Sequence, residues 1–289
     1  MRKLSDVLKQ QYGRKVRRLA LSGGRTCPNR DGTKSIGGCT FCSLGGSGEF
    51  ASALSSTDEE ILAAKRLLKE PEDAEGFIAY FQSFTATYGD FDEIARRFEE
   101  VLRRDDIWIL AIATRPDCID DRMLDLLVSM NRIKPVWIEL GLQTMHDFTA
   151  ERINRCYPLS VFEETYHRLK DAGLTVIVHM ILGLPGESRE DMLESMRYLG
   201  TLHPDGVKIG MLQILKGTAL AEEYLEHPFP LLSMEDYCDL VEESIRILPD
   251  DTIIHRMTGD PARDLLIAPE WTLHKKRVLN AITRRLARR

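Results

Sequence analysis

The sequence has no long uninterrupted apolar run, and this excludes a membrane-spanning helix of the usual length. Residues 1–15, MRKLSDVLKQQYGRK, contain no apolar core and no small-residue cleavage site, so we expect no secretory signal. Internal repeats and low-complexity linkers are missing as well. The expected compartment is the cytoplasm, where cysteine thiols stay reduced and available to iron.

A large excess of charge of one sign is also missing, since the formal net charge is −6. The overall balance therefore gives no argument for nucleic acid as a partner. The distribution is uneven, because residues 275–289 carry seven Lys and Arg residues and no acidic residue. Such an end is suited to contact phosphates, but it also fits a solvated helix end whose cations favour the helix dipole. Both interpretations stay open.

What the chain does have is a dense group of cysteines in residues 25–48. Eleven residues separate Cys27 from Cys39, two separate Cys39 from Cys42, and the stretch is rich in glycine without a helical or strand period. This pattern indicates metal ligands on a loop. Three thiolates can hold three corners of a 4Fe–4S cluster. No CxxC or HxxxH partner lies near enough to complete a zinc ribbon, but catalytic zinc can use three protein ligands and a water, so zinc is the second interpretation. A disulfide is the third.

Apolar strands alternate with amphipathic helices over much of the chain, which predicts an α/β fold with a parallel sheet covered by helices. The expected strands are residues 16–21, 77–81, 107–113, 136–142, 174–182 and 207–212. The expected helices are residues 4–11, 57–71, 92–104, 122–131, 160–173 and 188–202, with capping boxes at 57–60 and 160–163. About six parallel βα units fit an open, partial TIM-type barrel, whose chemistry lies at the carboxyl ends of the strands.

The alternation weakens after Leu215. A helix over 233–248, a short strand over 252–255 and a basic helix from Trp271 onward are expected there. We therefore predict residues 1–215 as the partial barrel, including the cysteine loop, and residues 216–289 as a C-terminal extension packed on it.

Polar residues on the apolar strands are candidates for a site. Glu139 is costly to bury alone, so it either contacts a ligand or pairs with Arg115 or Arg152. Arg115 follows a strand end and could clamp a carboxylate or phosphate. His179 is either a satisfied core residue or an inward-facing one.

The block TCPNRDG, followed by GGCTFCS, resembles the start of a radical S-adenosylmethionine (SAM) enzyme. More narrowly, it resembles the YhcC/YtqA type, whose YtqA branch is also called MnmL, and which is related to the radical SAM domain of the Elongator catalytic subunit. The spacing of the first two cysteines departs from the common three residues but is typical of this narrower group. The resemblance continues in order through YFQSF (80–84), TRPD (114–117), ELGLQ (139–143), HMILGLPGE (179–187) and HRMTGD (255–260).

The resemblance implies a 4Fe–4S cluster on Cys27, Cys39 and Cys42, with SAM chelating the open iron. An electron from the reduced cluster would then cleave SAM to a 5′-deoxyadenosyl radical. The residues that the resemblance assigns to SAM are Phe81, Gln82, Ser83, Glu139, Gln143, Gly183 and Gly186. Phe81, Gln82 and Ser83 stand where other radical SAM enzymes carry the Gly-Gly-Glu segment that holds the SAM amine. The residues expected to act in catalysis are Arg115, Glu139 and His179.

The resemblance also implies a substrate class. The YtqA branch is implicated in converting 5-carboxymethylaminomethyluridine to 5-aminomethyluridine at the tRNA wobble position, so the expected partners are a tRNA anticodon loop and a flavodoxin- or ferredoxin-type electron donor. Arg256, Thr258 and Gly259 are expected on the substrate side or at the closure of the barrel. Two alternatives stay open, a radical SAM enzyme for a small metabolite and a non-enzymatic Fe–S or zinc protein that binds RNA. The sequence assigns no role to Cys118, Cys156 or Cys238.

Overall fold

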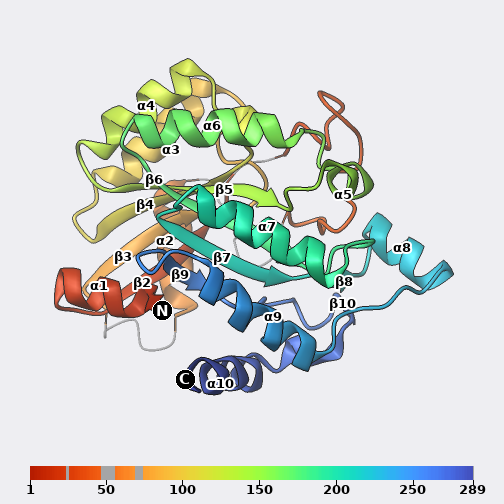
Figure 1. The fold of residues 1–289 in the computed structure, drawn as a ribbon. Helices are drawn as coiled ribbons and strands as arrows, with labels where there is room; N and C mark the ends of the chain where they lie inside the picture. The colour runs from red at the N-terminus through yellow and green to blue at the C-terminus, as the bar shows by residue number, and fades with distance from the viewer. Residues whose placement is uncertain (24–25, 47–55, 69–73, 289) are drawn as a thin grey trace.

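The computed structural model describes residues 1–23, 26–46, 56–68 and 74–288. Its main feature is an eight-stranded sheet curved into an open half-barrel, with strand order β1-β9-β7-β6-β5-β4-β3-β2 (Figure 1). All of its strand pairs are parallel. The strands are β1 Arg2–Lys3, β2 Val16–Leu21, β3 Gly76–Phe81, β4 Ile107–Thr114, β5 Val136–Gln143, β6 Thr175–Leu182, β7 Gly206–Met211 and β9 Ile253–Arg256. The predicted α/β class and partial barrel are confirmed.

Helices follow most strands, and most of them cover the outer face of the sheet. They are α1 Leu4–Tyr12, α2 Thr57–Arg66, α3 Phe91–Leu102, α4 Asp121–Asn131, α5 Asp147–Arg152, α6 Leu159–Asp171, α7 Arg189–Thr201, α8 Ala219–Glu226, α9 Met234–Ile247 and α10 Lys275–Leu286. Short 3-10 turns are η2 Pro116–Cys118 and η3 Glu270–Leu273, and a small antiparallel pair joins β8 Ile214–Leu215 to β10 Leu266–Ala268. Within the described ranges, none of these helices has the length and apolar character needed to cross a bilayer.

Two apolar clusters hold the sheet from its two faces. The larger one packs the outer face against the helices, with fully buried rings such as Phe98, Phe162 and Tyr237. The smaller one lies on the inner face, where Ile78, Ile109 and neighbouring side chains meet Leu8 of α1. Because burying such side chains stabilises the fold by about 1.5–3 kcal/mol each, the strands form a rigid frame with α1 packed inside the half-barrel.

The chain's two ends complete the sheet in a way that the alternation of strands and helices did not predict. The sequence predicts a short strand over residues 252–255 but does not indicate its neighbours. In the structure, β9 pairs in parallel with both β7 and β1. Residues after Leu215 therefore contribute to the barrel wall. The division of the chain at residue 215 stays a prediction.

Both predicted capping boxes need correction. The N-cap of α2 is Ser56, whose hydroxyl accepts from the Glu59 amide at 3.2 Å, so the cap lies one residue before Thr57. The cap predicted at Ser160 is wrong, because α6 begins at Leu159 behind Pro158 and no side chain caps it. Ser160 thus lies inside the first turn. The predicted helix end at Pro71 and part of the predicted cysteine loop, including Arg25 and residues 47–48, lie outside the described residues.

Gly23 is required where β2 leads into the cysteine loop. A Cβ atom at this position would lie 2.4 Å from the Ser83 carbonyl oxygen, and that backbone cannot turn away as a side chain can. We expect Gly23→Ala to lower the free energy of unfolding by about 1–3 kcal/mol, as overpacked core positions do. Urea unfolding followed by tryptophan fluorescence measures this.

Gly200 provides the control, because a Cβ there would meet its nearest atom, the Ile247 carbonyl oxygen, at 3.4 Å. Gly200 lies within α7, so Gly200→Ala is expected to leave stability unchanged or raise it by up to about 1 kcal/mol. Equal stability of the two variants would show that the β2–β3 ends are not in this close contact.

Candidate active site

A cavity of about 800 Å³ lies in the half-barrel, between the cysteine loop and the C-terminal segment. This volume lies within the range of sites that enclose small ligands. Among the residues selected from the sequence, those that line it are Cys27, Cys39, Cys42, Gln82, Arg115, Glu139, Gln143 and His179. Arg256, Thr258 and Gly259 line it too. Segments far apart in the chain thus meet at one cavity.

The cysteine loop is tied to the barrel by backbone and amide hydrogen bonds. The Thr40 amide donates to the Ile153 carbonyl at 3.0 Å, and the Thr40 carbonyl accepts from the Leu220 amide at 2.9 Å. Asn154, in the left-handed region at φ 53°, donates from Nδ2 to the Gly38 carbonyl at 2.8 Å. These bonds fix the loop against the ends of α5 and α8, so the three thiols face one cavity.

The chemistry of the three thiols fits a 4Fe–4S cluster. Asn29 Nδ2 lies 3.6 Å from Cys39 Sγ, and Thr85 Oγ1 lies 3.4 Å from Cys27 Sγ. Donors placed at sulfur stabilise thiolates and tune a cluster. Burial, together with the neighbouring Cys42, raises the pKa of the Cys39 thiol to about 12. The thiol proton must leave when iron binds, so cluster assembly releases protons.

The remaining cysteines lie outside this group. Cys118 is half-buried beside Asp117, Cys156 is exposed, and Cys238 is buried in α9. None of the three lines the cavity as far as the structure is described.

Gln143 takes an unusual backbone conformation at the end of β5. Its φ is 64°, a region that non-glycine residues seldom adopt and that clusters at functional sites. Its side-chain oxygen accepts from the Tyr157 hydroxyl at 3.2 Å. A Cβ on Gly141 would lie 2.5 Å from Gln143 Nε2, so glycine there makes room for the amide. The strand end is thus shaped to present Gln143 to the cavity.

Arg115 lines the cavity, but a carboxylate of the protein already occupies its guanidinium. Nε and Nη2 donate to Asp117 at 2.9 and 2.8 Å, and Nη1 donates to the Arg155 carbonyl at 2.9 Å. Such a bidentate pair is the geometry that a substrate carboxylate would use. In this arrangement Arg115 holds the cavity wall together, and its role toward a substrate stays a prediction.

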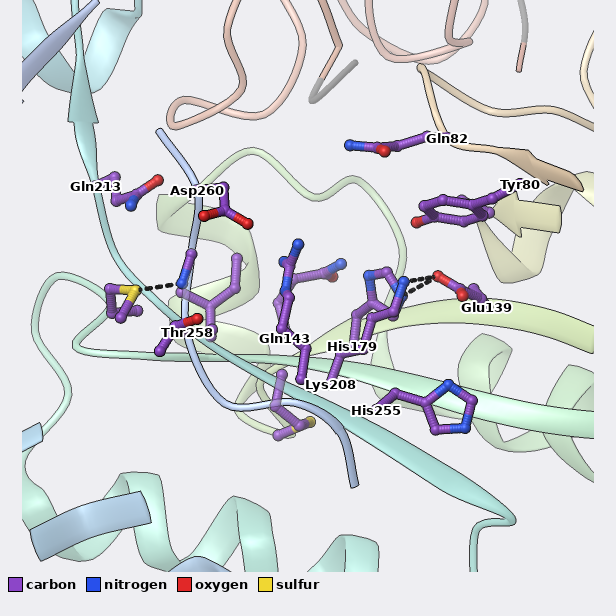
Figure 2. A pocket seen from close by; sticks show the side chains of 18 of the residues that line it. Tyr80, Gln82, Glu139, Gln143, His179, Lys208, Gln213, His255, Thr258 and Asp260 are labelled. Carbon is purple, nitrogen blue, oxygen red and sulfur yellow. Dashed lines mark hydrogen bonds and ion pairs between the residues drawn. The ribbon is translucent and has the colours of Figure 1, made fainter. Parts of the chain in front are cut away.

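Glu139 is the centre of a buried charge cluster on the inner face of the sheet. Its Oε2 pairs with Lys208 Nζ and accepts from His179 Nε2 at 2.8 Å, as Figure 2 shows. Arg18 Nη2 approaches its Oε1 at 3.5 Å. The predicted pairing of Glu139 with Arg115 or Arg152 is wrong, since Arg152 pairs with Glu223 on the surface. Strands β2, β5, β6 and β7 bring this cluster together, which the sequence alone could not show.

Electrostatics within this cluster keep Glu139 ionised. Burial opposes the charged form, but the charges of Lys208 and Arg18 outweigh it and hold the pKa of the carboxyl well below its usual range. Burial and the charge of Lys208 lower the pKa of His179 to about 4. His179 is therefore neutral near pH 7, and its Nε2–H donates to Glu139. The Tyr80 ring lies beneath both cations, 4.2 Å from Lys208 Nζ and 4.8 Å from the Arg18 guanidinium carbon.

Sequence reasoning missed Arg18 and Tyr80 as residues of the cavity. Arg18 lies in the strand VRRLAL. A charge on an apolar strand is the signal that selected Glu139. The same reasoning applied to the first strand would have found Arg18.

Four predicted SAM contacts lie outside the described lining of the cavity. The Phe81 ring packs outward against Phe98, with 5.0 Å between ring centroids, so only its backbone is left for a ligand. Ser83 is buried beside Gly23. Gly183 and Gly186 have φ values of 86° and 88°, which explains the glycines by conformation alone. The contacts of these four residues with SAM stay predictions.

Comparison with known proteins agrees with this arrangement. Residues 21–199 match the family described as the Radical SAM superfamily, and residues 204–288 match the Radical_SAM C-terminal domain. The chain is 41% identical to "Uncharacterized protein YtqA" of Bacillus subtilis over 289 residues, covering 99% of this chain and 89% of YtqA. It is 36% identical to "Protein YhcC" of Escherichia coli over 265 residues, covering 91% of this chain and 85% of YhcC.

A solved structure shows the same fold. Elp3 of the archaeon Methanocaldococcus infernus superposes with a TM-score of 0.63 at 16% identity, over 93% of this chain and 63% of that one. This chain therefore spans less than two thirds of the archaeal protein.

Proposed function

The chain belongs to the radical SAM superfamily, and from this premise we propose that it modifies the wobble uridine of tRNA. It is an enzyme that uses a 4Fe–4S cluster and SAM. Cys27, Cys39 and Cys42 would hold the cluster at one end of the cavity, and Gln82 and Gln143 lie at strand ends that line the same cavity. When bound, the reduced cluster and SAM supply a 5′-deoxyadenosyl radical that removes hydrogen from an unactivated carbon.

The observation that carries the tRNA proposal is the position of the basic helix α10. Its residues Lys275 and Leu279 line the cavity that contains the cysteines. Lys276, Arg277 and Arg284 of the same helix are exposed. Exposed cations beside a cavity can hold the phosphates around a base that enters it. A cavity of about 800 Å³ can take one splayed-out nucleotide of a loop but no folded RNA.

The chemistry proposed is the one that the motif resemblance implies. A 5-carboxymethylaminomethyl group on uridine would lose a hydrogen atom from the methylene between its amine and its carboxylate. Loss of one further electron, which the oxidised cluster would take back, would leave a carbon–nitrogen double bond, and water would split that bond and release the two-carbon fragment as glyoxylate. The product would be 5-aminomethyluridine. The protein would position the base and its substituent in the half-barrel. We further propose a flavodoxin- or ferredoxin-type electron donor and a cytoplasmic location, consistent with six free cysteines in the described chain.

An anaerobic assay tests the proposal. The reconstituted protein is reduced with dithionite and given SAM, with and without tRNA that carries 5-carboxymethylaminomethyluridine. We expect 5′-deoxyadenosine to rise with that tRNA and 5-aminomethyluridine to appear in its digest by mass spectrometry.

Each other outcome has a distinct meaning. Deoxyadenosine that is indifferent to tRNA would redirect the search to a small metabolite. No deoxyadenosine from a protein with a full cluster would contradict the enzymatic role and favour an Fe–S protein that only binds RNA.

A further inference from the structure

Cations outnumber carboxylates on the inner face of the half-barrel. Glu139 lies beside both Lys208 and Arg18, and its Oε2 already forms an ion pair with Lys208. Arg18 Nη2 is buried and makes no hydrogen bond among the described residues. Arg256 lies beside Lys208 in the β7–β9 register and lines the same cavity. No carboxylate of the described chain pairs with the Arg256 guanidinium.

Three other cations that line the cavity differ, because the protein holds them. Arg115 is bound by Asp117, and Lys275 pairs with Asp260. Arg30 donates to the Cys42 carbonyl at 2.8 Å. Arg18 and Arg256 lie near a single carboxylate, Glu139, whose Oε2 already pairs with Lys208. Arg256 is exposed and the Arg18 side chain is 26% exposed, so both can meet a ligand, and this excess of positive charge favours an anionic one.

These charged groups lie deeper in the half-barrel than the carboxyl ends of the strands. Arg18 and Lys208 each precede the last residue of their strand by three positions, and Glu139 precedes the end of β5 by four. A strand rises about 3.3 Å per residue, so these groups lie roughly 10 Å below the strand ends. Gln143 is the last residue of β5, and Gln82 directly follows β3. A group that binds in the deeper layer is therefore separated from one bound at the strand ends.

This deeper layer also offers an acceptor. Glu139 Oε1 is buried and makes no hydrogen bond among the described residues, although Arg18 approaches it. His255 Nδ1, on the same face, is likewise buried and without a partner in the described chain. Guanidinium donors beside an open carboxylate oxygen suit a ligand that carries a carboxylate and a protonated amine close together.

We propose that Arg18, Arg256 and Lys208 bind the carboxylate of the substrate, while Glu139 Oε1 accepts a hydrogen bond from its adjacent amine. The inference rests on the proposed function, whose carboxymethylamino group has both charges on either side of one methylene. Because the carboxylate and the amine on either side of the methylene are both bound, the methylene is held at a fixed position relative to the three cysteines. The site thus selects the group on which the reaction occurs.

The test compares two substrates in the reconstituted, reduced holoenzyme. One is an anticodon stem-loop RNA with 5-carboxymethylaminomethyluridine, and the other is the same RNA with the carboxylate converted to a neutral carboxamide. Product is quantified by mass spectrometry, and kcat/KM is measured for each RNA. Because charge-assisted hydrogen bonds are strong, we expect the wild type to prefer the acid by roughly 10- to 100-fold. In Arg18→Gln and in Arg256→Gln, this preference is expected to fall below about threefold.

Lys275→Gln is the matched control, since it also removes a cavity-lining cation, but one paired with Asp260. It is expected to change the KM values for both RNAs equally and to keep the preference. Iron content confirms that each variant carries its cluster.

A wild type that processes both RNAs equally well, or Arg variants that keep the full preference, would overturn the anion site and leave the proposed function intact. Variants whose only change is a higher KM for SAM would overturn it too, by placing the SAM carboxylate there. A wild type that cleaves SAM but acts on neither RNA would overturn the proposed function, and the inference with it.

Discussion

Cys39→Ala is expected to abolish 5′-deoxyadenosine formation and to reduce bound iron from about four atoms per chain to below about one. Cys39 is one of three cysteines that line the cavity, and a 4Fe–4S cluster with an open iron has no protein ligand to spare. The Cys39 thiol is half-buried, and Asn29 Nδ2 lies 3.6 Å from its sulfur. The effect is measured by anaerobic reconstitution, followed by an iron assay and the visible absorbance of the thiolate-bound cluster.

Cys156→Ala is the control for this experiment. Cys156 lies next to the same loop, through Asn154, but it is exposed and does not line the cavity. It is expected to keep its iron and its SAM cleavage. If Cys156→Ala or Cys118→Ala lost as much iron as Cys39→Ala, the ligand set would extend beyond the three predicted cysteines. If Cys39→Ala kept a full cluster, the assignment of Cys39 would be wrong.

The fold could be predicted from the sequence where local pattern and long-range structure agree. Strands β2 to β7 are apolar runs separated by amphipathic helices, and the parallel order follows from that alternation. Strand β9 shows the limit. It has four residues, IIHR, and its place between β7 and β1 depends on contacts with the distant N-terminal strand as well as with β7. No periodicity in a segment of that length specifies its neighbours.

The site was predictable in its parts but not in its pairings. Cys27, Cys39 and Cys42 are close in sequence, so their common position follows from spacing. Glu139 was correctly recognised as a charge that needs partners, but Lys208 comes from a strand 69 residues away. Proximity of that kind is decided by strand register. Arg115 differs, because its partner Asp117 lies two residues away and turns back onto it through η2, so this pairing is local.

Glu139→Gln is expected to lower the free energy of unfolding by about 3–5 kcal/mol, because removing one partner of a buried ion pair leaves the other charge uncompensated. The side chains of Glu139 and Lys208 are 0% and 2% exposed, so a charge left without its partner there is poorly solvated. Urea unfolding of the purified protein measures the change. Asp92→Asn is the control. Its ion pair with Arg122 is exposed on the surface, so its loss is expected to have no measurable effect.

A second variant and a pH series separate this charge effect from a packing effect. Glu139→Gln combined with Lys208→Met removes both buried charges, and we expect it to be more stable than Glu139→Gln alone. The pKa of Glu139 is held below its ordinary value of 4.5 in the folded protein. Its stabilising contribution is therefore complete above about pH 5 and is lost as the pH falls through the folded value. The stabilities of wild type and Glu139→Gln should converge on acidification below about pH 4.5. A constant difference down to the acid unfolding transition would mean that the amide disturbs packing, and that the carboxylate charge does not hold this part of the barrel together.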